Sequence, residues 1–144
     1  MVVQRALFDT NILIDYLNGI PQAKDVLTEY HINPAISAIT WMEVMVGAKK
    51  QGPALELKTR QFLGQFLLLP ITDEVAERAV ELRHSQHVKL PDAIIWATAQ
   101  VGFRTLISRN PKDFGTDNGV LMPYRLLSGS VTASRTAPPA AAAT

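Results

Sequence analysis

The chain alternates short apolar segments with longer stretches of helical periodicity, and this alternation limits the folds that it can adopt. The short segments are rich in Leu, Ile, Val and Ala and lie at residues 5–9, 32–37, 67–71, 105–108 and 120–124. Their length and composition predict buried strands, because parallel strands are covered on both faces. Strands joined by helical crossovers indicate an α/β domain with three layers, in which helices cover both faces of a mostly parallel central sheet.

Helix start signals lie between these segments. Thr40 followed three residues later by Glu43 forms a capping-box pattern, and Thr72 is a typical N-cap residue. Proline suits the first turn of a helix, so Pro21 and Pro91 mark further starts. Residues 91–101 are apolar nearly all round, which predicts a central and buried helix. We therefore predict helices that begin near Thr10, Pro21, Thr40, Ala54, Thr72 and Pro91.

The composition fits one domain. A chain of 144 residues with 47% hydrophobic content can bury a single sizeable core. From residue 128 onward the sequence changes to Ser, Thr, Ala and Pro, so we expect a folded domain over residues 1–127 and a low-complexity tail over residues 128–144.

Charge and cysteine content narrow the function classes. The formal net charge of +1 comes from 14 basic and 13 acidic residues, so bulk charge neither requires nor excludes a nucleic-acid partner. The absence of cysteine excludes disulfides, thiolate zinc sites and thiol nucleophiles. Since no apolar stretch approaches the ~18 residues of a membrane helix and no signal peptide is evident, we expect a soluble, cytoplasmic protein.

Four acidic residues lie where an element meets a turn. Asp9 ends the first strand, Glu43 and Asp92 fall in the first turns of two helices, and Asp113 follows the fourth strand together with Asn110. In an open α/β sheet such positions can converge at the carboxyl ends of the strands. We therefore treat Asp9, Glu43, Asp92 and Asp113 as candidate ligands of one metal site.

Each acid also has a structural explanation, and single residues do not decide between the two. Asp9 can cap the following helix. Glu43 can close a capping box with Thr40. Asp92 can complement the dipole of its helix, and Asp113 can be a solvated loop residue. The metal-site hypothesis therefore depends on the set of acids.

The chemistry of the set favours a hard divalent cation. Several carboxylates held close together repel one another unless a cation neutralises them. Oxygen ligands without cysteine or histidine point to Mg²⁺ or Mn²⁺. Such ions polarise a phosphoryl oxygen and lower the pKa of a bound water, which favours phosphodiester hydrolysis.

Further polar residues have secondary roles in this hypothesis. Ser37 and Thr40 are candidates to orient Asp9 or a bound water. Asp15, on the first helix, is expected to be solvated or peripheral. The candidates for a phosphate-binding rim are the basic residues Lys49, Lys50, Lys89, Arg104, Arg109 and Lys112.

Four motifs occur in a characteristic order. They are residues 8–15 (FDTNILID), 37–43 (SAITWME) with Gly47 after them, 90–99 (LPDAIIWATA) and 107–114 (ISRNPKDF). Over residues 5–125 the chain therefore resembles PIN-domain ribonucleases, specifically the VapC-type toxins of bacterial type II toxin–antitoxin pairs.

The resemblance implies roles for particular residues. The implied metal ligands are the acids Asp9, Glu43 and Asp92, and the implied supporting residues are Thr10, Asn11, Thr40 and Asn110. Many relatives have an acid where this chain has Asn110, whereas others pair Asn there with an acid three residues later, as Asp113 does here. Without a fourth acid a site for one metal ion is expected.

The resemblance also implies an activity and partners. It implies a Mg²⁺- or Mn²⁺-dependent endoribonuclease, commonly a homodimer, that cleaves tRNA or other translation-related RNA. A VapB-like antitoxin would neutralise it by reaching into the active site. The basic rim, in particular Lys49, Lys50, Lys89, Arg109 and Lys112, would then contact RNA.

Two alternatives remain. A haloacid-dehalogenase-like phosphotransferase also places an Asp after its first strand, here Asp9, but it expects a second Asp at the position of Asn11. A non-catalytic PIN-like module would bind RNA or protein without cleaving it. Retention of Asp9, Glu43 and Asp92 weighs against such a module, because a scaffold gains nothing from their mutual repulsion.

Overall fold

The structure, a computed structural model, describes residues 5–114 and 119–126. Within these residues the strands are β1 (Ala6–Phe8), β2 (Ala35–Ser37), β3 (Leu67–Leu69), β4 (Thr105–Ile107) and β5 (Val120–Leu121). The helices are α1 (Thr10–Leu17), α2 (Pro21–Glu29), α3 (Ala38–Lys49), α4 (Pro53–Leu63), α5 (Asp73–Gln86) and α6 (Leu90–Val101), with a short 3₁₀ helix, η1 (Pro111–Phe114).

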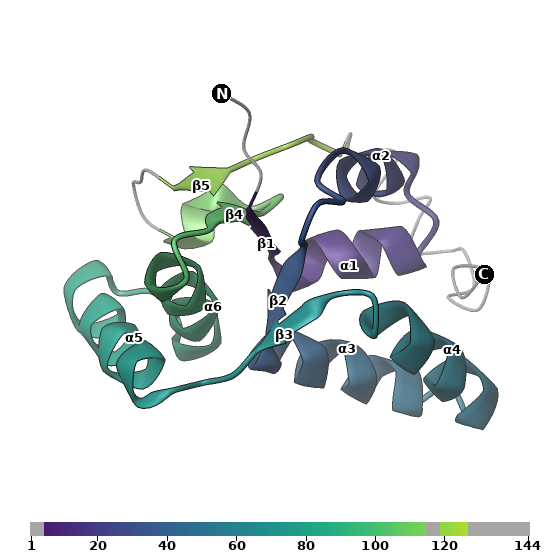
Figure 1. Ribbon diagram of the computed structural model, residues 1–144, viewed down its shortest axis with the longest axis horizontal. Coiled ribbons are helices and arrows are strands. Elements are labelled where there is room, and N and C mark those ends of the chain that lie inside the picture. The colour runs from purple at the N-terminus through teal and green to yellow at the C-terminus, as the bar shows by residue number, and fades with distance from the viewer. Residues whose placement is uncertain (1–4, 115–118, 127–144) are drawn as a thin grey trace.

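The five strands form one sheet in the order β3-β2-β1-β4-β5, and every neighbouring pair is parallel (Figure 1). In the register Phe8 pairs with Ile107, and Ser37 pairs with Leu69. The predicted parallel sheet is therefore confirmed. Because all strands run the same way, the residues that follow them are brought to one edge of the sheet, and β1 lies at its centre.

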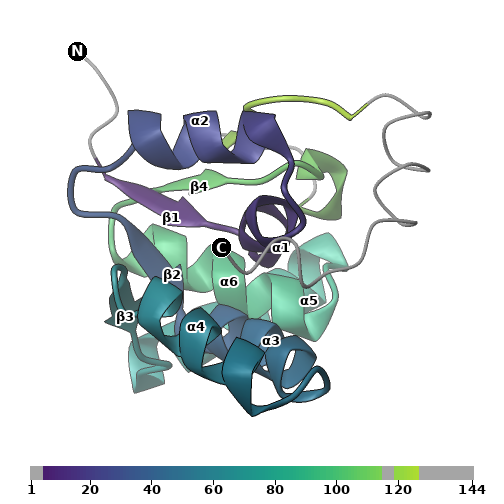
Figure 2. The ribbon, with the colours of Figure 1, turned by 90° about the vertical axis from the view of Figure 1, so that its right-hand side faces the viewer.

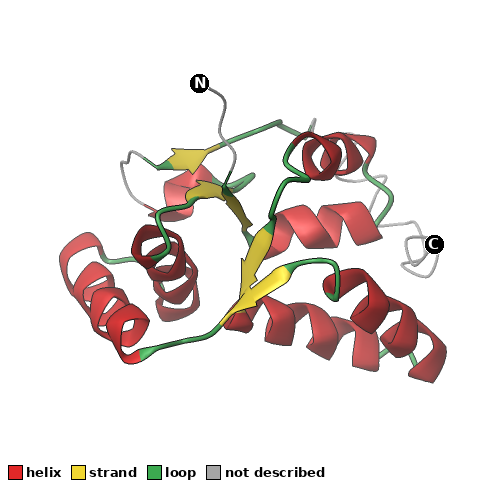
Figure 3. Ribbon diagram, in the orientation of Figure 1, coloured by secondary structure: helices red, strands yellow, loops and turns green. Residues whose placement is uncertain are grey.

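Helices cover both faces of the sheet, as the secondary-structure colouring shows (Figure 3). Helices α1 to α4 lie on one face and α5 and α6 on the other, and the turned view places α1 to α4 in front of the sheet (Figure 2). Side chains alternate along β1, so Phe8 joins the core under α1 and α3 whereas Leu7 packs with α5 and α6. The predicted three-layer α/β/α architecture is confirmed.

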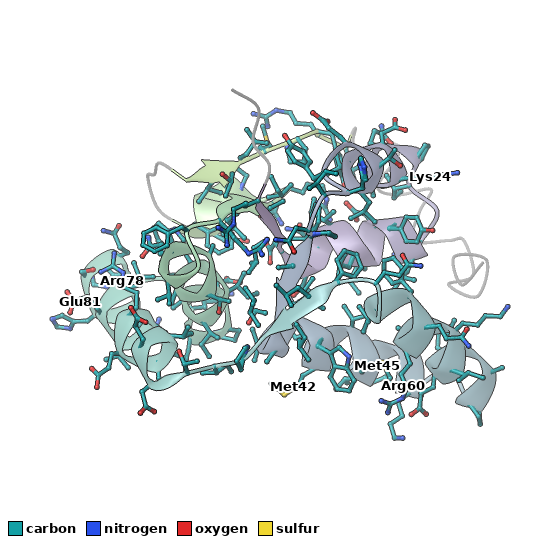
Figure 4. All side chains as sticks on the ribbon, in the orientation of Figure 1. Lys24, Met42, Met45, Arg60, Arg78 and Glu81 are labelled. Atoms are coloured by element: carbon teal, nitrogen blue, oxygen red, sulfur yellow. The ribbon has the colours of Figure 1, made fainter. Side chains whose placement is uncertain are left out.

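The local sequence explains how α5 and α6 pack. The Thr72 hydroxyl caps α5 by accepting from the Val75 amide at 3.2 Å. Val75, Ala79 and Leu82 are buried, while Glu81 points outward from α5 (Figure 4) and the exposed Arg78 donates to the Gln100 side chain of α6. Val80 lies outside this core and is 63% exposed. Helix α6 is the central helix that its sequence predicts, with buried side chains Ala93, Ile95, Trp96, Ala97, Thr98 and Ala99.

Two local predictions are wrong. Helix α3 begins two residues before Thr40, because the Ser37 hydroxyl accepts from the Ile39 amide at 3.2 Å and supplies the N-cap. Glu43 therefore lies beyond the first turn and forms no capping box. After β4 the chain forms η1, whose Phe114 packs edge-on against Trp96 with ring centroids 5.9 Å apart.

Two further expectations concern the ends of the chain and the membrane. The boundary expected between residues 127 and 128, and the tail beyond it, lie outside the described residues. In the part of the chain that the structure describes, none of the helices has the length and apolar character needed to cross a membrane.

Candidate metal centre

Asp9 lies at the carboxyl end of the central strand and is buried, with 5% of its surface exposed. Its amide continues the sheet by donating to the Ile107 carbonyl at 2.9 Å. Its Oδ1 accepts from the Thr10 amide at 2.7 Å, so Asp9 caps α1, and its Oδ2 accepts from the Ser108 hydroxyl at 2.8 Å. The capping explanation for Asp9 is therefore correct, and these contacts also fix the orientation of the carboxylate.

The electrostatics of Asp9 set it apart from an ordinary cap. Burial is the largest cause that raises the pKa of Asp9, the hydrogen bonds from Ser108 and Thr10 lower it, the charges of Asp92 and Glu43 raise it, and the net pKa is about 6. Among the described residues no basic side chain contributes to this balance. Asp9 is thus a buried carboxylate whose charged neighbours have the same sign.

Ser108 is a site residue that the sequence reasoning missed. It is fully buried, follows β4, and accepts from the Asn110 amide at 3.0 Å while donating to Asp9. The Asn11 amide nitrogen lies 3.4 Å from the Ser108 hydroxyl. Since Phe8 pairs with Ile107, the next residues of the two strands are Asp9 and Ser108. The signal that could have indicated Ser108 is its place in the sequence, as a polar residue directly after the fourth strand.

Thr10 connects Glu43 to the first helix. The Thr10 hydroxyl donates to Glu43 Oε1 at 2.6 Å and lies 3.0 Å from the hydroxyl oxygen of the fully buried Thr40. Thr40 therefore faces Thr10 instead of capping α3, and Glu43 is exposed at the sheet edge. The structure brings together Thr10, Thr40 and Glu43. Ser37, the other candidate to orient Asp9, instead caps α3.

Asp92 lies in the first turn of α6 and is half-buried. The pKa of Asp92 is raised to about 6: burial is the largest cause, the charges of Asp113 and Glu43 add to the rise, and Lys89 opposes it. Asp113, in η1, is exposed and lies within reach of the Asp92 charge. Charge repulsion thus links all four predicted acids at one edge of the sheet.

The donor set fits a hard cation in its chemistry. Its members offer carboxylate oxygens, and the repulsion at Asp9 and Asp92 is of the kind that a divalent cation relieves. Asn110 lies beside the set, because its backbone amide donates a hydrogen bond to the Ser108 hydroxyl. Across residues 5–114 and 119–126, no three acidic or histidine side chains converge at the spacing of ligands around a single ion.

Asp15 is not solvated, contrary to expectation. It is 4% exposed, and Arg109 donates to it through Nε at 2.6 Å and through Nη2 at 3.1 Å. The Tyr124 hydroxyl donates to the same carboxylate at 2.6 Å, and burial followed by the Asp15 interaction raises the pKa of Tyr124. Arg109, a predicted rim residue, is therefore engaged in a structural ion pair.

The prediction that Arg104 belongs to the phosphate-binding rim is also wrong. It is buried and donates through Nη1 to the carbonyl of Ala6 at 3.2 Å and to that of Asn33 at 2.8 Å. These residues lie at the amino ends of β4, β1 and β2, at the edge opposite the acids. Arg104 thus ties strand starts together.

The remaining rim lysines occupy different places. Lys89 directly precedes α6 and lies near enough to Asp92 to lower its pKa. Lys112 is exposed in η1, next to Asp113. Lys49 lies 3.4 Å from Glu56 in an exposed ion pair, and with Lys50 it stands at the carboxyl end of α3, about 9 Å along the helix from Glu43 by the rise per residue.

Comparison with known proteins identifies the family. The family model of the PIN domain matches residues 6–115. A chain of a toxin–antitoxin complex from Klebsiella pneumoniae is 52% identical, with a TM-score of 0.80, and the match covers 84% of this chain and 99% of that one. No curated protein sequence matches this chain.

More distant structures share the architecture. FitAcB from Neisseria gonorrhoeae is 25% identical with a TM-score of 0.74, covering 84% of this chain and 99% of that one. DNA-bound VapBC from Salmonella typhimurium is 21% identical with a TM-score of 0.70, covering 82% and 96%, and this likeness concerns the fold alone. The chain belongs to the PIN-domain family, and the resemblance to VapC-type toxin nucleases that its motifs predicted is confirmed.

Proposed function

We propose that this protein is a metal-dependent endoribonuclease toxin that hydrolyses phosphodiester bonds in RNA, with tRNA or other translation-related RNA as its substrate. The observation that carries the proposal is the like charge that surrounds the buried Asp9. Asp9 is buried beside Glu43 and Asp92, and both raise its pKa. Such an arrangement destabilises a fold unless it serves a cation, which gives it a functional explanation.

The ligands in this proposal are Asp9, Glu43, Asp92 and Asp113. PIN-domain nucleases generally use divalent metal ions. A bound Mg²⁺ or Mn²⁺ would supply Lewis-acid polarisation of a phosphoryl oxygen and a lowered pKa for the attacking water. Because the pKa values of Asp9 and Asp92 lie at about 6, both carboxylates are largely ionised at neutral pH and available as ligands.

The supporting residues orient these carboxylates. Ser108 and the Thr10 amide hold the two oxygens of Asp9, and the Thr10 hydroxyl holds Glu43. Asn11 accepts from the Arg109 amide at 3.2 Å and approaches Ser108, so it braces the loop after β4. This bracing role differs from that of the second acid in a haloacid-dehalogenase-like phosphotransferase, whose position Asn11 occupies.

The partners belong to the proposal as well. The Klebsiella relative comes from a toxin–antitoxin complex, and its match spans nearly all of that chain. We infer that this protein is held inactive by a VapB-like antitoxin, that it forms a homodimer, and that it acts in the cytoplasm. Coexpression with a VapB-like antitoxin should yield a stable complex without nuclease activity.

The decisive test of the activity is to incubate total cellular RNA with the protein, with and without Mg²⁺ or Mn²⁺, and to sequence the new RNA ends. The proposal predicts defined new ends that require the metal and disappear with Asp9→Asn, Glu43→Gln and Asp92→Asn. Metal-independent ends, or wild-type cleavage by any two of these variants, would contradict it. A covalent phosphate trapped on Asp9 would instead favour a phosphotransferase.

A further inference from the structure

A basic pocket lies beside the acids. It has a volume of about 340 Å³ and is lined by Arg109, Asn110, Pro111, Lys112, Met122 and Arg125. One wall is the loop after β4 with the start of η1, and the other is the segment after β5. The pocket adjoins the metal centre. The backbone amide of its lining residue Asn110 donates a hydrogen bond to the Ser108 hydroxyl, and its lining residue Lys112 directly precedes Asp113.

A buried contact holds the two walls of the basic pocket together. Asp15, on α1, receives two hydrogen bonds from Arg109 in one wall and a third from Tyr124 in the other. Tyr124 lies between the lining residues Met122 and Arg125. With its carboxylate buried and triply bonded, Asp15 fixes the separation of the walls, so the pocket is formed before any ligand enters.

The lining attracts an anion. Asp15 neutralises Arg109, whereas neither Lys112 nor Arg125 takes part in an ion pair with any residue that the structure describes. The lining includes no acidic residue. Lys112 and Arg125 therefore present two uncompensated positive charges, and Pro111 and Met122 add apolar surface between them.

We propose that the basic pocket binds one nucleotide of a single-stranded RNA substrate, with its phosphate between Lys112 and Arg125 and its base or sugar against Pro111 and Met122. This inference rests on the proposed function. An RNA strand whose scissile phosphate lies at the acids meets strong negative charge there. A neighbouring phosphate in the basic pocket offsets this repulsion and fixes the position of the strand. Unpaired bases are also free to turn into a pocket.

The test measures RNA binding apart from cleavage. A fluorescein-labelled single-stranded RNA of mixed sequence, about 15 nucleotides long so that it spans both sites, is titrated with the full-length protein in EDTA at several salt concentrations. Fluorescence anisotropy compares the wild type with Lys112→Ala/Arg125→Ala. The matched control, Lys24→Ala/Lys58→Ala, removes two exposed positive charges from α2 and α4, and Figure 4 shows Lys24 pointing away from the domain.

The pocket variant should bind this RNA about tenfold more weakly than the wild type. The slope of its log binding constant against log salt concentration should be about 0.7 smaller in magnitude, the value for one phosphate contact in a single strand. The control should retain the wild-type slope. Both variants should keep the wild-type melting temperature, because the substituted side chains are exposed.

The outcomes separate this inference from the proposed function. Equal affinity and slope for the pocket variant and the control would overturn the pocket proposal, and metal-dependent RNA cleavage by the same wild-type preparation would leave the nuclease proposal standing. A pocket variant that binds RNA normally but loses the antitoxin would show that the pocket takes an acidic peptide, which also contradicts this inference. Wild-type protein that neither binds nor cleaves RNA would overturn both.

Discussion

Asp9 caps α1 and Asp15 lies within the same helix six residues later, and both carboxylates are buried. Asp15 is balanced by the Arg109 guanidinium and by the Tyr124 hydroxyl. Asp9 receives hydrogen bonds from neutral donors, and its charged neighbours are the acids Glu43 and Asp92. Burial alone thus does not separate a structural carboxylate from a functional one, whereas the sign of the surrounding charge does.

The largest expected difference between the two residues is in catalysis. Asp9→Asn keeps a good N-cap but removes a charged ligand, so metal-dependent RNA cleavage should fall by at least about a thousandfold. Asp15→Asn should retain most of the cleavage activity of the folded protein. Single-turnover cleavage rates of both variants measure this contrast, and similar losses in the two would remove the distinction.

The free energy of unfolding should depend more strongly on Asp15 than on Asp9. Asp15→Asn leaves the Arg109 charge without its partner, which should lower the free energy of unfolding by about 2–3 kcal/mol, below the usual range for buried pairs because Arg109 is 24% exposed. Urea denaturation measures the change. The double variant Asp15→Asn/Arg109→Gln should recover part of the loss, and a single variant as stable as the wild type would show that the pair is not structural.

The pH dependence of stability isolates the uncompensated charge of Asp9. Folding raises the pKa of Asp9 from 3.8 to about 6, so the folded state holds the proton more tightly. The resulting stabilisation is complete below pH 3.8 and is lost as the pH rises through about 6. In EDTA the wild type should therefore lose about 2 kcal/mol relative to Asp9→Asn between about pH 4 and pH 7. If the free energies of unfolding of the wild type and Asp9→Asn change in parallel with pH, burial does not disfavour the charge of Asp9.

The smallest expected effect concerns the orientation of Asp9. Ser108→Ala removes the 2.8 Å hydrogen bond to Asp9 Oδ2 and should reduce cleavage about 10- to 100-fold, as for other residues that orient a metal ligand. Ser108→Thr keeps the hydroxyl and is the matched control, with melting temperatures recorded for both. Full activity of Ser108→Ala would show that the hydrogen bond does not position Asp9.

Much of the fold follows from local sequence. Short apolar segments and helix start signals predict the strands, their parallel pairing and the buried α6, and the strand-to-helix turn at Asp9 predicts a polar edge. The start of α3 was wrong because Ser37 and Thr40 are both good caps, and the local sequence does not choose between them. The structure chooses Ser37 and frees Thr40 to face Thr10.

The errors at the site have a common physical cause, which is sequence distance. Asp15 meets Arg109 and Tyr124 across 94 and 109 residues, and Ser108 meets Asp9 across 99. Composition and periodicity carry no information on such contacts. A solvated aspartate and a buried, paired one look alike in the sequence, and only the register of β1 against β4 reveals Ser108.

The most direct test of the central claim is the melting temperature of the full-length protein with and without Mg²⁺. At an ion concentration about a hundredfold above the dissociation constant, the wild type and Asp15→Asn should both gain about 5–10 °C, because the ion binds the folded state and relieves the repulsion around Asp9. Asp9→Asn should gain far less. An equal gain in all three proteins would place the ion elsewhere and contradict the account.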